Sequence, residues 1–470
     1  MYDIKVIGNN KYGDSMQNIS IWKDYSNKTD YNKLDKDINV DVLIIGGGIT
    51  GVSALYHLKD SNMKVALVEQ NKIAFSTTGN STGKLSFLQN DLVDKIRKHS
   101  GNKNAFSYIG FQVEGINKIV KLINDKKIDC NLTKVDSYLY TNKEKEIDKL
   151  KELSMFLNNR GINTKETSNT LVESKYMFSV DNTYLINPIK FVEGLLKDNT
   201  YPIYENTSIL KIEKKKDSYI SYTKDNKIKS KWVVIASHYP YFIKPLFFPI
   251  KVNLEKSYIS ASKKKIDPVS LISYSNPFIS IRTYKDYLIY LSNSHTINKD
   301  VDDKNNFNEL LKKVSDLKLK PSYLWSNIDI MTPDGMPDIG RIKDNMLIST
   351  GYNTWGLISG FMGGSILSDI INNKKNKYIE LFSPNRNSIG FIPTYFSNIV
   401  KNIEGYINGI NSNLDTSNKV VSKCPHAKCG LRFNEIEHTW DCPCHGSRFD
   451  INGKCISGPA NRDIIVSDNG

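Results

Sequence analysis

A run of glycines near the N-terminus restricts the fold of this chain more than any other feature. Glycines stand at positions 46, 48 and 51, and an apolar run at 42–45 comes directly before them. A helix-like stretch follows from 49 to about 58, and a second apolar run occupies 64–69. Short apolar runs on either side of a helical stretch are typical of buried parallel strands. The pattern predicts one βαβ unit and therefore a fold of the α/β class.

Each of these glycines has a separate physical task. Gly46 permits a tight turn, Gly48 lets the backbone approach a pyrophosphate, and Gly51 lets helix and strand pack closely. The N-terminus of the helix offers unpaired N–H groups and a positive dipole end to phosphates. Glu69 ends the second strand, where a carboxylate can accept hydrogen bonds from ribose hydroxyls. Strand, helix and distal acid together favour a dinucleotide site over a coincidental turn.

Two later segments bear on which dinucleotide binds. Segment 76–84 brings hydroxyls, glycines and one lysine, which can wrap a pyrophosphate and the edge of a flavin. Segment 332–356 contains a strand, a glycine, an aromatic loop and the start of a helix, far along the chain from the first unit. A second chain segment that closes on the ring system favours FAD over NAD.

Over roughly residues 40–385 this arrangement resembles the D-amino-acid-oxidase-like (DAO) family of FAD oxidoreductases, in which the late motif helps cradle the flavin. The resemblance places Ile209 beside the adenine and puts segment 234–238 where the family often has Ala-Thr-Gly. His238 departs from that pattern and is either a polar neighbour of the cofactor or an ordinary hydrogen-bonded histidine. The residues that the resemblance and the motif assign to FAD are Gly46, Gly48, Ile49, Thr50, Gly51, Glu69, Thr77, Thr78, Gly79, Lys84, Ile209, Ala236, Gly351, Trp355, Gly356 and Leu357.

Cysteine usage limits what the C-terminus can be. The chain has 470 residues and six cysteines, and five of the six lie in the last 47 residues. A chain-wide disulfide framework is therefore excluded, and a local metal or redox module is favoured. Cys130 lies far from the others and is interpreted as a buried or idle thiol.

Two short pairs in this block supply thiolates and imidazoles. Cys424 and His426 form a C-x-H pair, and Cys442 and His445 form a C-x-x-H pair after fifteen intervening residues. Two cysteines on one iron and two histidines on the other make a Rieske [2Fe–2S] centre, with a potential of about −150 to +300 mV. Structural zinc is the competing interpretation, although six candidate ligands are too many for its four places.

The block closely resembles a Rieske protein beyond its ligand pairs. The resemblance implies a disulfide between Cys429 and Cys444, a covering loop at 458–460, and a hydrogen bond from Ser447 to a bridging sulfide. Phe449 stands where high-potential members carry a tyrosine that donates to a cysteine sulfur. We therefore expect a potential below that of respiratory-type members.

The expected architecture is α/β, with a Rossmann-like FAD-binding domain interleaved with an antiparallel-sheet substrate domain and a shortened all-β Rieske module. The alternating segments 279–283 and 287–291 predict a hairpin. The linker reaches Cys424 almost directly, so the module lacks strands that usually precede this ligand and would lean on the flavin domain or a second subunit.

The expected domain limits follow from these segments. The expected division is an N-terminal arm at 1–39, an FAD-binding domain at 40–100, 171–240 and 326–385, a substrate or cap domain at 101–170 and 241–325, a helix near 394–407 and linker within 386–418, and the Rieske module at 419–470.

These parts suggest how electrons move. A flavin takes up two electrons and can release them singly, and a [2Fe–2S] centre carries one at a time. The hypothesis is an FAD-dependent dehydrogenase that oxidises a small molecule, by family resemblance an amine or amino acid, and passes electrons to an unidentified acceptor. Arg282 on the predicted hairpin either clamps a substrate carboxylate or is an ordinary surface arginine, and His295 is a second candidate on the substrate side.

Two other classes stay open on the sequence alone. One is a flavin and iron–sulfur protein for electron transfer or redox sensing, without turnover of a small molecule. The other is a non-catalytic protein with a degenerate metal-binding tail.

Charge and hydropathy indicate which partners and which location to expect for the protein. The net charge is +14, but the lysines occur in scattered runs without interleaved aromatics, which favours a solvated basic surface over a nucleic-acid site. The N-terminus has no apolar signal segment, and no stretch is uniformly apolar, so we expect a cytoplasmic protein without a transmembrane segment. The sequence does not indicate an oligomeric state.

Overall fold

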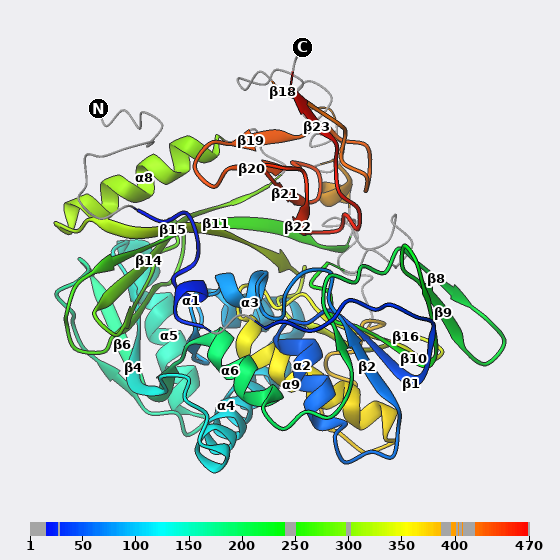
Figure 1. Ribbon diagram of the computed structural model, residues 1–470. Helices are drawn as coiled ribbons and strands as arrows, with labels where there is room; N and C mark the ends of the chain where they lie inside the picture. Colours follow the sequence, from blue (N-terminus) through cyan, green and yellow to red (C-terminus); the bar gives the residue numbers. More distant parts are fainter. Residues whose placement is uncertain are drawn as a thin grey trace.

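The computed structural model contains two large sheets with helices around them, and a small C-terminal module that lies against strands of the second sheet (Figure 1). It describes residues 16–26, 29–239, 251–297, 302–386, 396–400, 403, 407 and 419–468. The helix predicted near 394–407 falls largely outside the described residues.

The first sheet has eight strands, five of which run parallel in the order β17-β10-β1-β2-β7. Strand β16 lies antiparallel beside β17, and the hairpin β8–β9 joins through β10. The strands are β1 (Ile38–Ile45), β2 (Val65–Val68), β7 (Ile203–Tyr204), β8 (Lys211–Lys214), β9 (Tyr219–Tyr222), β10 (Lys227–Ile235), β16 (Asp338–Lys343) and β17 (Met346–Thr350). The predicted βαβ unit is therefore confirmed, and it forms the centre of this sheet.

Helices α2 (Ile49–His57) and α9 (Gly356–Ile371) pack against each other beside this sheet. Ser53 on α2 donates its hydroxyl to the Phe361 carbonyl on α9 at 2.6 Å. The early and late glycine-rich segments are thus joined by packing, although some 300 residues separate them in the sequence.

The turn between β1 and α2 depends on glycine. Gly46 has φ of +112°, and a Cβ there would lie 2.5 Å from the Ala236 carbonyl oxygen. A Cβ on Gly51 would lie 1.9 Å from the carbonyl oxygen of Gly46. The tight turn and the close helix–strand contact expected from the sequence are both present.

The second sheet has nine strands in the order β15-β11-β14-β13-β12-β4-β6-β3, with β5 on β6, and nearly all of its pairs are antiparallel. The strands are β3 (Lys84–Leu85), β4 (Thr133–Thr141), β5 (Thr164–Glu166), β6 (Tyr176–Leu185), β11 (Asn253–Lys263), β12 (Ser270–Ser273), β13 (Ser280–Tyr284), β14 (Tyr287–Thr296) and β15 (Pro321–Met331). The hairpin β13–β14 confirms the predicted alternation.

The two sheets do not follow the domain limits expected from the sequence. Strands β3 and β6 fall in segments that we assigned to the FAD-binding domain, but both belong to the second sheet, where β6 pairs with β4 and β3 pairs with β6. The division at 170–171 thus cuts between neighbouring strands. The chain crosses from one sheet to the other here, which hydrophobic periodicity does not reveal.

Helices complete the two layers. They are α1 (Ile21–Asp24), α3 (Thr77–Asn80), α4 (Leu92–Lys126), the 3₁₀ turn η1 (Glu144–Glu146), α5 (Ile147–Asn158), α6 (Pro188–Leu196) and α8 (Asp303–Asp316). Helix α4 is kinked at Gly101, where φ is +80°. Segment 101–170, assigned to the substrate or cap domain, contains most of α4, all of α5, and strands β4 and β5.

The C-terminal module contains a four-stranded antiparallel sheet of β19 (Arg432–Asn434), β20 (Thr439–Asp441), β21 (Arg448–Asp450) and β22 (Cys455–Ser457). A separate pair joins β18 (Lys419–Val421) to β23 (Val466–Asp468). Among the described residues of the module, β18 alone precedes the first cysteine of the C-x-H pair. The short N-terminal side expected from the sequence is present.

The contact of Gly51 yields a test of the fold. Gly51→Ala should destabilise the protein by about 3 kcal/mol or more and prevent dinucleotide binding, because the backbone oxygen of Gly46 cannot move aside. Gly110→Ala on α4 is the matched control, because a Cβ there meets nothing within 4 Å and alanine favours the helix by about 1 kcal/mol. Thermal unfolding and flavin content measure both variants, and a Gly51→Ala protein that kept both would contradict this geometry.

Candidate functional site

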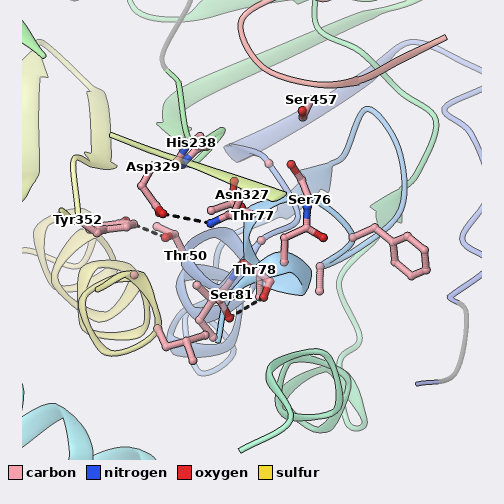
Figure 2. A pocket seen from close by; sticks show the side chains of 18 of the residues that line it. Thr50, Ser76, Thr77, Thr78, Ser81, His238, Asn327, Asp329, Tyr352 and Ser457 are labelled. Carbon is pink, nitrogen blue, oxygen red and sulfur yellow. Dashed lines mark hydrogen bonds between the residues drawn. The ribbon is translucent and has the colours of Figure 1, made fainter. Parts of the chain in front are cut away.

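A long cavity begins at the turn after β1 and continues past α3 to the start of α9 (Figure 2). Most of the residues assigned to FAD line it. These are Gly46, Gly48, Ile49, Thr50, Glu69, Thr77, Thr78, Lys84, Ile209, Ala236, Trp355, Gly356 and Leu357. Gly51, Gly79 and Gly351 do not line it and instead allow close packing behind the wall, where added Cβ atoms would meet Gly46, Ala74 and Thr332.

The buried carboxyl group of Glu69 organises the glycine-rich turn. One of its oxygens accepts from the Gly47 N–H at 2.7 Å, and the other accepts from the Asn71 N–H at 2.8 Å. Burial raises the pKa of Glu69, and these two hydrogen bonds oppose the rise. The carboxyl group is thus held at the end of β2, where it can also accept ribose hydroxyls.

The start of α2 has the features of a phosphate site. The Ile49 N–H donates to the Thr78 hydroxyl at 3.1 Å, so a short polar helix faces the helix N-terminus. A Cβ on Gly48 would approach that same hydroxyl to 3.2 Å. A glycine cradle, a helix N-terminus and a distal acid around one cavity fit FAD.

Sequence reasoning missed several polar residues of this cavity. Tyr352 shares hydrogen bonds of 2.7 Å with the hydroxyls of Thr50 and Ser349. Asn327 and Asp329 lie two positions apart on β15, and the Asn327 amide donates to Asp329 at 3.2 Å (Figure 2). The alternation of β15 was the available signal, but without the fold it does not show which face meets the cavity.

Asp329 is the most perturbed acid of the cavity wall. Burial raises its pKa to about 7, and the neighbouring charge of Glu255 adds to the rise. His238 also lines the cavity, and burial lowers its pKa to about 4. At neutral pH the histidine is therefore uncharged, and the carboxyl group is close to its midpoint.

The structure does not place Arg282 in the cavity wall. Its guanidinium donates to four backbone carbonyls, of Thr82, Gly83, Ile186 and Thr283, at 2.6–3.0 Å. Arg282 on β13 is thus bonded to the segment before β3 and is buried. It is therefore neither the predicted carboxylate clamp nor a surface arginine. No local pattern indicates this role, since three of the four carbonyls come from distant segments.

His295 likewise lies outside the cavity wall. Its Nε2 pairs with the Tyr258 hydroxyl at 2.9 Å, and its Nδ1 pairs with the Thr296 carbonyl at 3.0 Å.

Lys84 does line the cavity, where its ammonium donates to the Leu271 carbonyl at 2.7 Å. Burial lowers the pKa of Lys84 well below its usual value, and the charge of Arg282 lowers it further.

The C-terminal module brings together the four predicted cluster ligands. Cys424 and Cys442 are buried free thiols, and the rings of His426 and His445 lie 4.9 Å apart between centroids. The Nδ1 atoms of both rings are buried and have no hydrogen-bond partner among the described residues. Burial lowers the pKa of His426 to about 4 and that of His445 to about 3.

The remaining sulfur atoms support the same ligand set. Cys429 and Cys444 form a disulfide, as the resemblance implied, with Cα atoms 6.6 Å apart. The Cys442 thiol donates to Cys424 and lowers the pKa of Cys424 to about 6, which favours the thiolate that iron binds. The sulfur atoms of Cys429, Cys442 and Cys444 also lie within 4.8 Å of one another, but the disulfide takes up two of them.

Two thiols and two buried, unpartnered imidazole nitrogens fit a Rieske [2Fe–2S] cluster. They fit structural zinc less well, because the disulfide and the covering loop have no role in a closed four-ligand site. Ser447 is fully buried, and its hydroxyl accepts from the Ala460 N–H at 3.1 Å, so it joins the loop to the ligand segment.

The module also forms part of the dinucleotide cavity. Ile456, Ser457 and Gly458 line it, and the Ile456 carbonyl accepts from the Asn71 side chain at 3.2 Å. The Asn461 amide donates to the carbonyls of Ile209 and Leu210 at 3.3 and 3.2 Å. The residues on either side of the covering loop therefore contact the dinucleotide-binding elements, including the predicted adenine end.

Fold and sites together define a flavin-dependent oxidoreductase with an attached [2Fe–2S] module. The profile of the DAO family, described as FAD dependent oxidoreductase, matches residues 41–370, and the profile of the Rieske [2Fe-2S] domain matches residues 415–467. The chain belongs to the DAO family and carries a C-terminal Rieske domain. Its cofactors are accordingly FAD and a Rieske-type cluster.

Individual proteins agree with this assignment. The chain is 27% identical to the putative Rieske 2Fe-2S iron-sulfur protein YhfW of Bacillus subtilis (strain 168), over 94% of this chain and 96% of that protein. It is 21% identical to gamma-glutamylputrescine oxidoreductase of Escherichia coli (strain K12), over 74% and 87% of the two chains. Glycine oxidase from Geobacillus kaustophilus shares the fold, with a TM-score of 0.61 and 16% identity over 74% of this chain and 99% of that one. Within the described part of the chain, no helix combines the length and apolar character needed to cross a bilayer.

Asp329 predicts a pH effect on stability. Its pKa is about 7 in the folded protein and near 3.8 when unfolded, so between these values the folded state holds the extra proton. Stability from this group is complete below pH 4 and is lost as pH rises to 7. Asp329→Asn should therefore gain stability relative to the unaltered protein over that range, by about 2 kcal/mol above pH 7. Urea unfolding at several pH values measures this.

The exposed Asp136 provides the control for that experiment, since Asp136→Asn removes the same charge at a solvated position. Its stability difference should stay within about 0.5 kcal/mol at every pH. A flat difference for Asp329→Asn as well would show that the carboxyl group is not held in its neutral form.

The side chain of Phe449 leads to a prediction about the midpoint potential of the cluster. Its side chain is fully buried in the module and cannot donate a hydrogen bond. Phe449→Tyr should raise the midpoint potential by about 60 mV, since a hydrogen bond to a charged acceptor is worth about 1.5 kcal/mol. Phe433→Tyr is the control, and an EPR-monitored titration measures all three proteins. An unaltered protein at the top of the Rieske range would contradict the prediction.

Proposed function

We propose that the protein is a dehydrogenase that oxidises a small amine or amino acid with FAD and passes the electrons singly through the Rieske cluster to an external acceptor. One observation carries this proposal. Residues 456–458 of the module line the same cavity as the glycine-rich turn, so the two redox sites adjoin within one chain. A two-electron site beside a one-electron site suits substrate oxidation coupled to single-electron delivery.

The cavity wall favours an amine over a substrate that needs a carboxylate clamp. Two lysines are among its described lining residues, and both are engaged. Lys72 pairs with Glu205 at 2.7 Å and with Asp30 at 3.1 Å, and Lys84 donates to a backbone carbonyl. Asp329 instead offers a carboxyl group to a positively charged substrate. The amine substrate class also agrees with the name of the Escherichia coli relative, gamma-glutamylputrescine oxidoreductase.

The test is anaerobic reduction of the purified protein by a panel of diamines, acylated diamines and amino acids. Amines should bleach the blue flavin band, and the EPR signal of the reduced cluster should follow. Asp329→Asn should raise KM for amines about tenfold, which corresponds to 1.4 kcal/mol of binding. Asp136→Asn, at an exposed position of β4, is the charge-matched control.

Other outcomes would point elsewhere. Faster reduction by amino acids, unaffected by Asp329→Asn, would overturn the amine preference. Reduction by a reduced carrier protein and by no small molecule would make this an electron-transfer or redox-sensing protein. A colourless preparation that binds neither cofactor would overturn the proposal entirely.

A further inference from the structure

A buried cluster of charges fixes how the module sits on the rest of the protein. The Lys256 ammonium on β11 lies 2.7 Å from the Asp441 carboxylate on β20 and 2.9 Å from Asp303 at the start of α8. Arg448 on β21 lies 3.1 Å from Asp441 and 2.7 Å from Glu437. The side chains of Lys256 and Arg448 are only 5% and 7% exposed. Buried ions tolerate little displacement, because movement leaves an uncompensated charge.

A backbone contact completes this attachment. The Ser326 N–H on β15 donates to Glu437 at 2.9 Å, and the Asn434 amide donates to Glu437 at 3.1 Å. Lys304 on α8 pairs with Glu435 at 2.9 Å at the more exposed rim. The module is therefore held by directional contacts on β11, β15 and α8, which determine which of its edges faces inward.

The edge that faces inward carries the two histidine ligands. Tyr239, which is 3% exposed, has its ring 6.2 Å from the ring of His426 and 6.2 Å from that of His445. A Cβ on Gly446, next to His445, would lie 3.1 Å from the Ile328 side chain. One aromatic side chain of the flavin domain thus contacts both ligands of the same iron.

The residue before Tyr239 leads back to the flavin cavity. His238 lines that cavity, and its carbonyl accepts from the Thr350 hydroxyl. A second, small cavity lies between His238, Tyr239, Thr77 and His445. The segment 238–239 thus extends from the cofactor cavity to the iron-binding edge of the module without an intervening element.

From this arrangement we infer that Tyr239 is a positioning residue for intramolecular electron transfer, and that it keeps the histidine ligands in contact with the wall of the flavin cavity. The inference rests on the proposed function only in requiring both cofactors on one chain. In each transfer one electron leaves the reduced flavin and one ferric ion becomes ferrous, with no bond made or broken. The electron partner at the histidine edge is therefore the FAD of the same chain, and an external acceptor meets the module elsewhere.

The test uses light instead of substrate, so it can be read even if no small molecule reduces the protein. Flavin in the full, cofactor-loaded chain is photoreduced with EDTA, and the rise of the reduced-cluster EPR signal gives the transfer rate. Tyr239→Leu should slow that rate by an order of magnitude or more, because a gap replaces the ring. Tyr239→Phe should retain the rate, since it keeps the ring and its packing.

Two further variants make the result specific. Phe433→Leu removes an aromatic ring of the module that packs on Trp440, away from the histidine edge, and should leave the rate unchanged. Lys256→Met should slow transfer without Tyr239 being altered, because it removes the cation that joins Asp303 to Asp441 and loosens the attachment.

Midpoint potentials of both centres are measured in every variant, since a rate that falls at constant driving force reports a change in how the two sites are positioned. Equal rates in Tyr239→Leu and the unaltered protein would overturn the inference. So would a slowed rate fully accounted for by a shifted potential. If Tyr239→Leu fails to fold, an unchanged rate in Lys256→Met overturns it instead.

Discussion

The arrangement of the two redox sites depends on the buried charges around Lys256. Two cations and three carboxylates meet where β11, α8 and the module join, and each is paired with an opposite charge. Their net contribution to stability is modest, because desolvation offsets attraction, but breaking one pair costs about 3–5 kcal/mol. The interaction therefore acts mainly through specificity, by permitting one orientation of the module and penalising the others.

This attachment explains how a short iron–sulfur module can be ordered. A unit of this size buries little apolar surface of its own, and small domains usually need additional support. Here the disulfide between Cys429 and Cys444 joins the two ligand segments, and Asn71 and Asn461 connect the covering loop to the dinucleotide-binding elements. Where the structure describes the module, β18 is the one strand before the first cluster cysteine, and contacts with β11, β15 and α8 give the module further support.

Local patterns predicted much of the structure because their physical causes are local. The turn at Gly46 needs glycine for backbone reasons, and the ligand pairs of the module have short fixed spacings. Arg282 and Asp329 were different, because their surroundings come from segments that only the fold brings together. The buried ion pairs of Lys256 could not be predicted either, since a lysine in a lysine-rich chain is expected to be a solvated surface residue. The crossing of the chain between the two sheets was missed for a similar reason, because strand periodicity does not specify the partner strand.

The inward-facing histidine edge has a consequence for biosynthesis. The nitrogen atoms available to iron are buried, and the flavin domain covers the edge that carries them. An iron–sulfur donor cannot reach these atoms while the module is attached in this way. Cluster insertion therefore requires a state in which the module is not closed onto the flavin domain, and the buried charges oppose a return to that state.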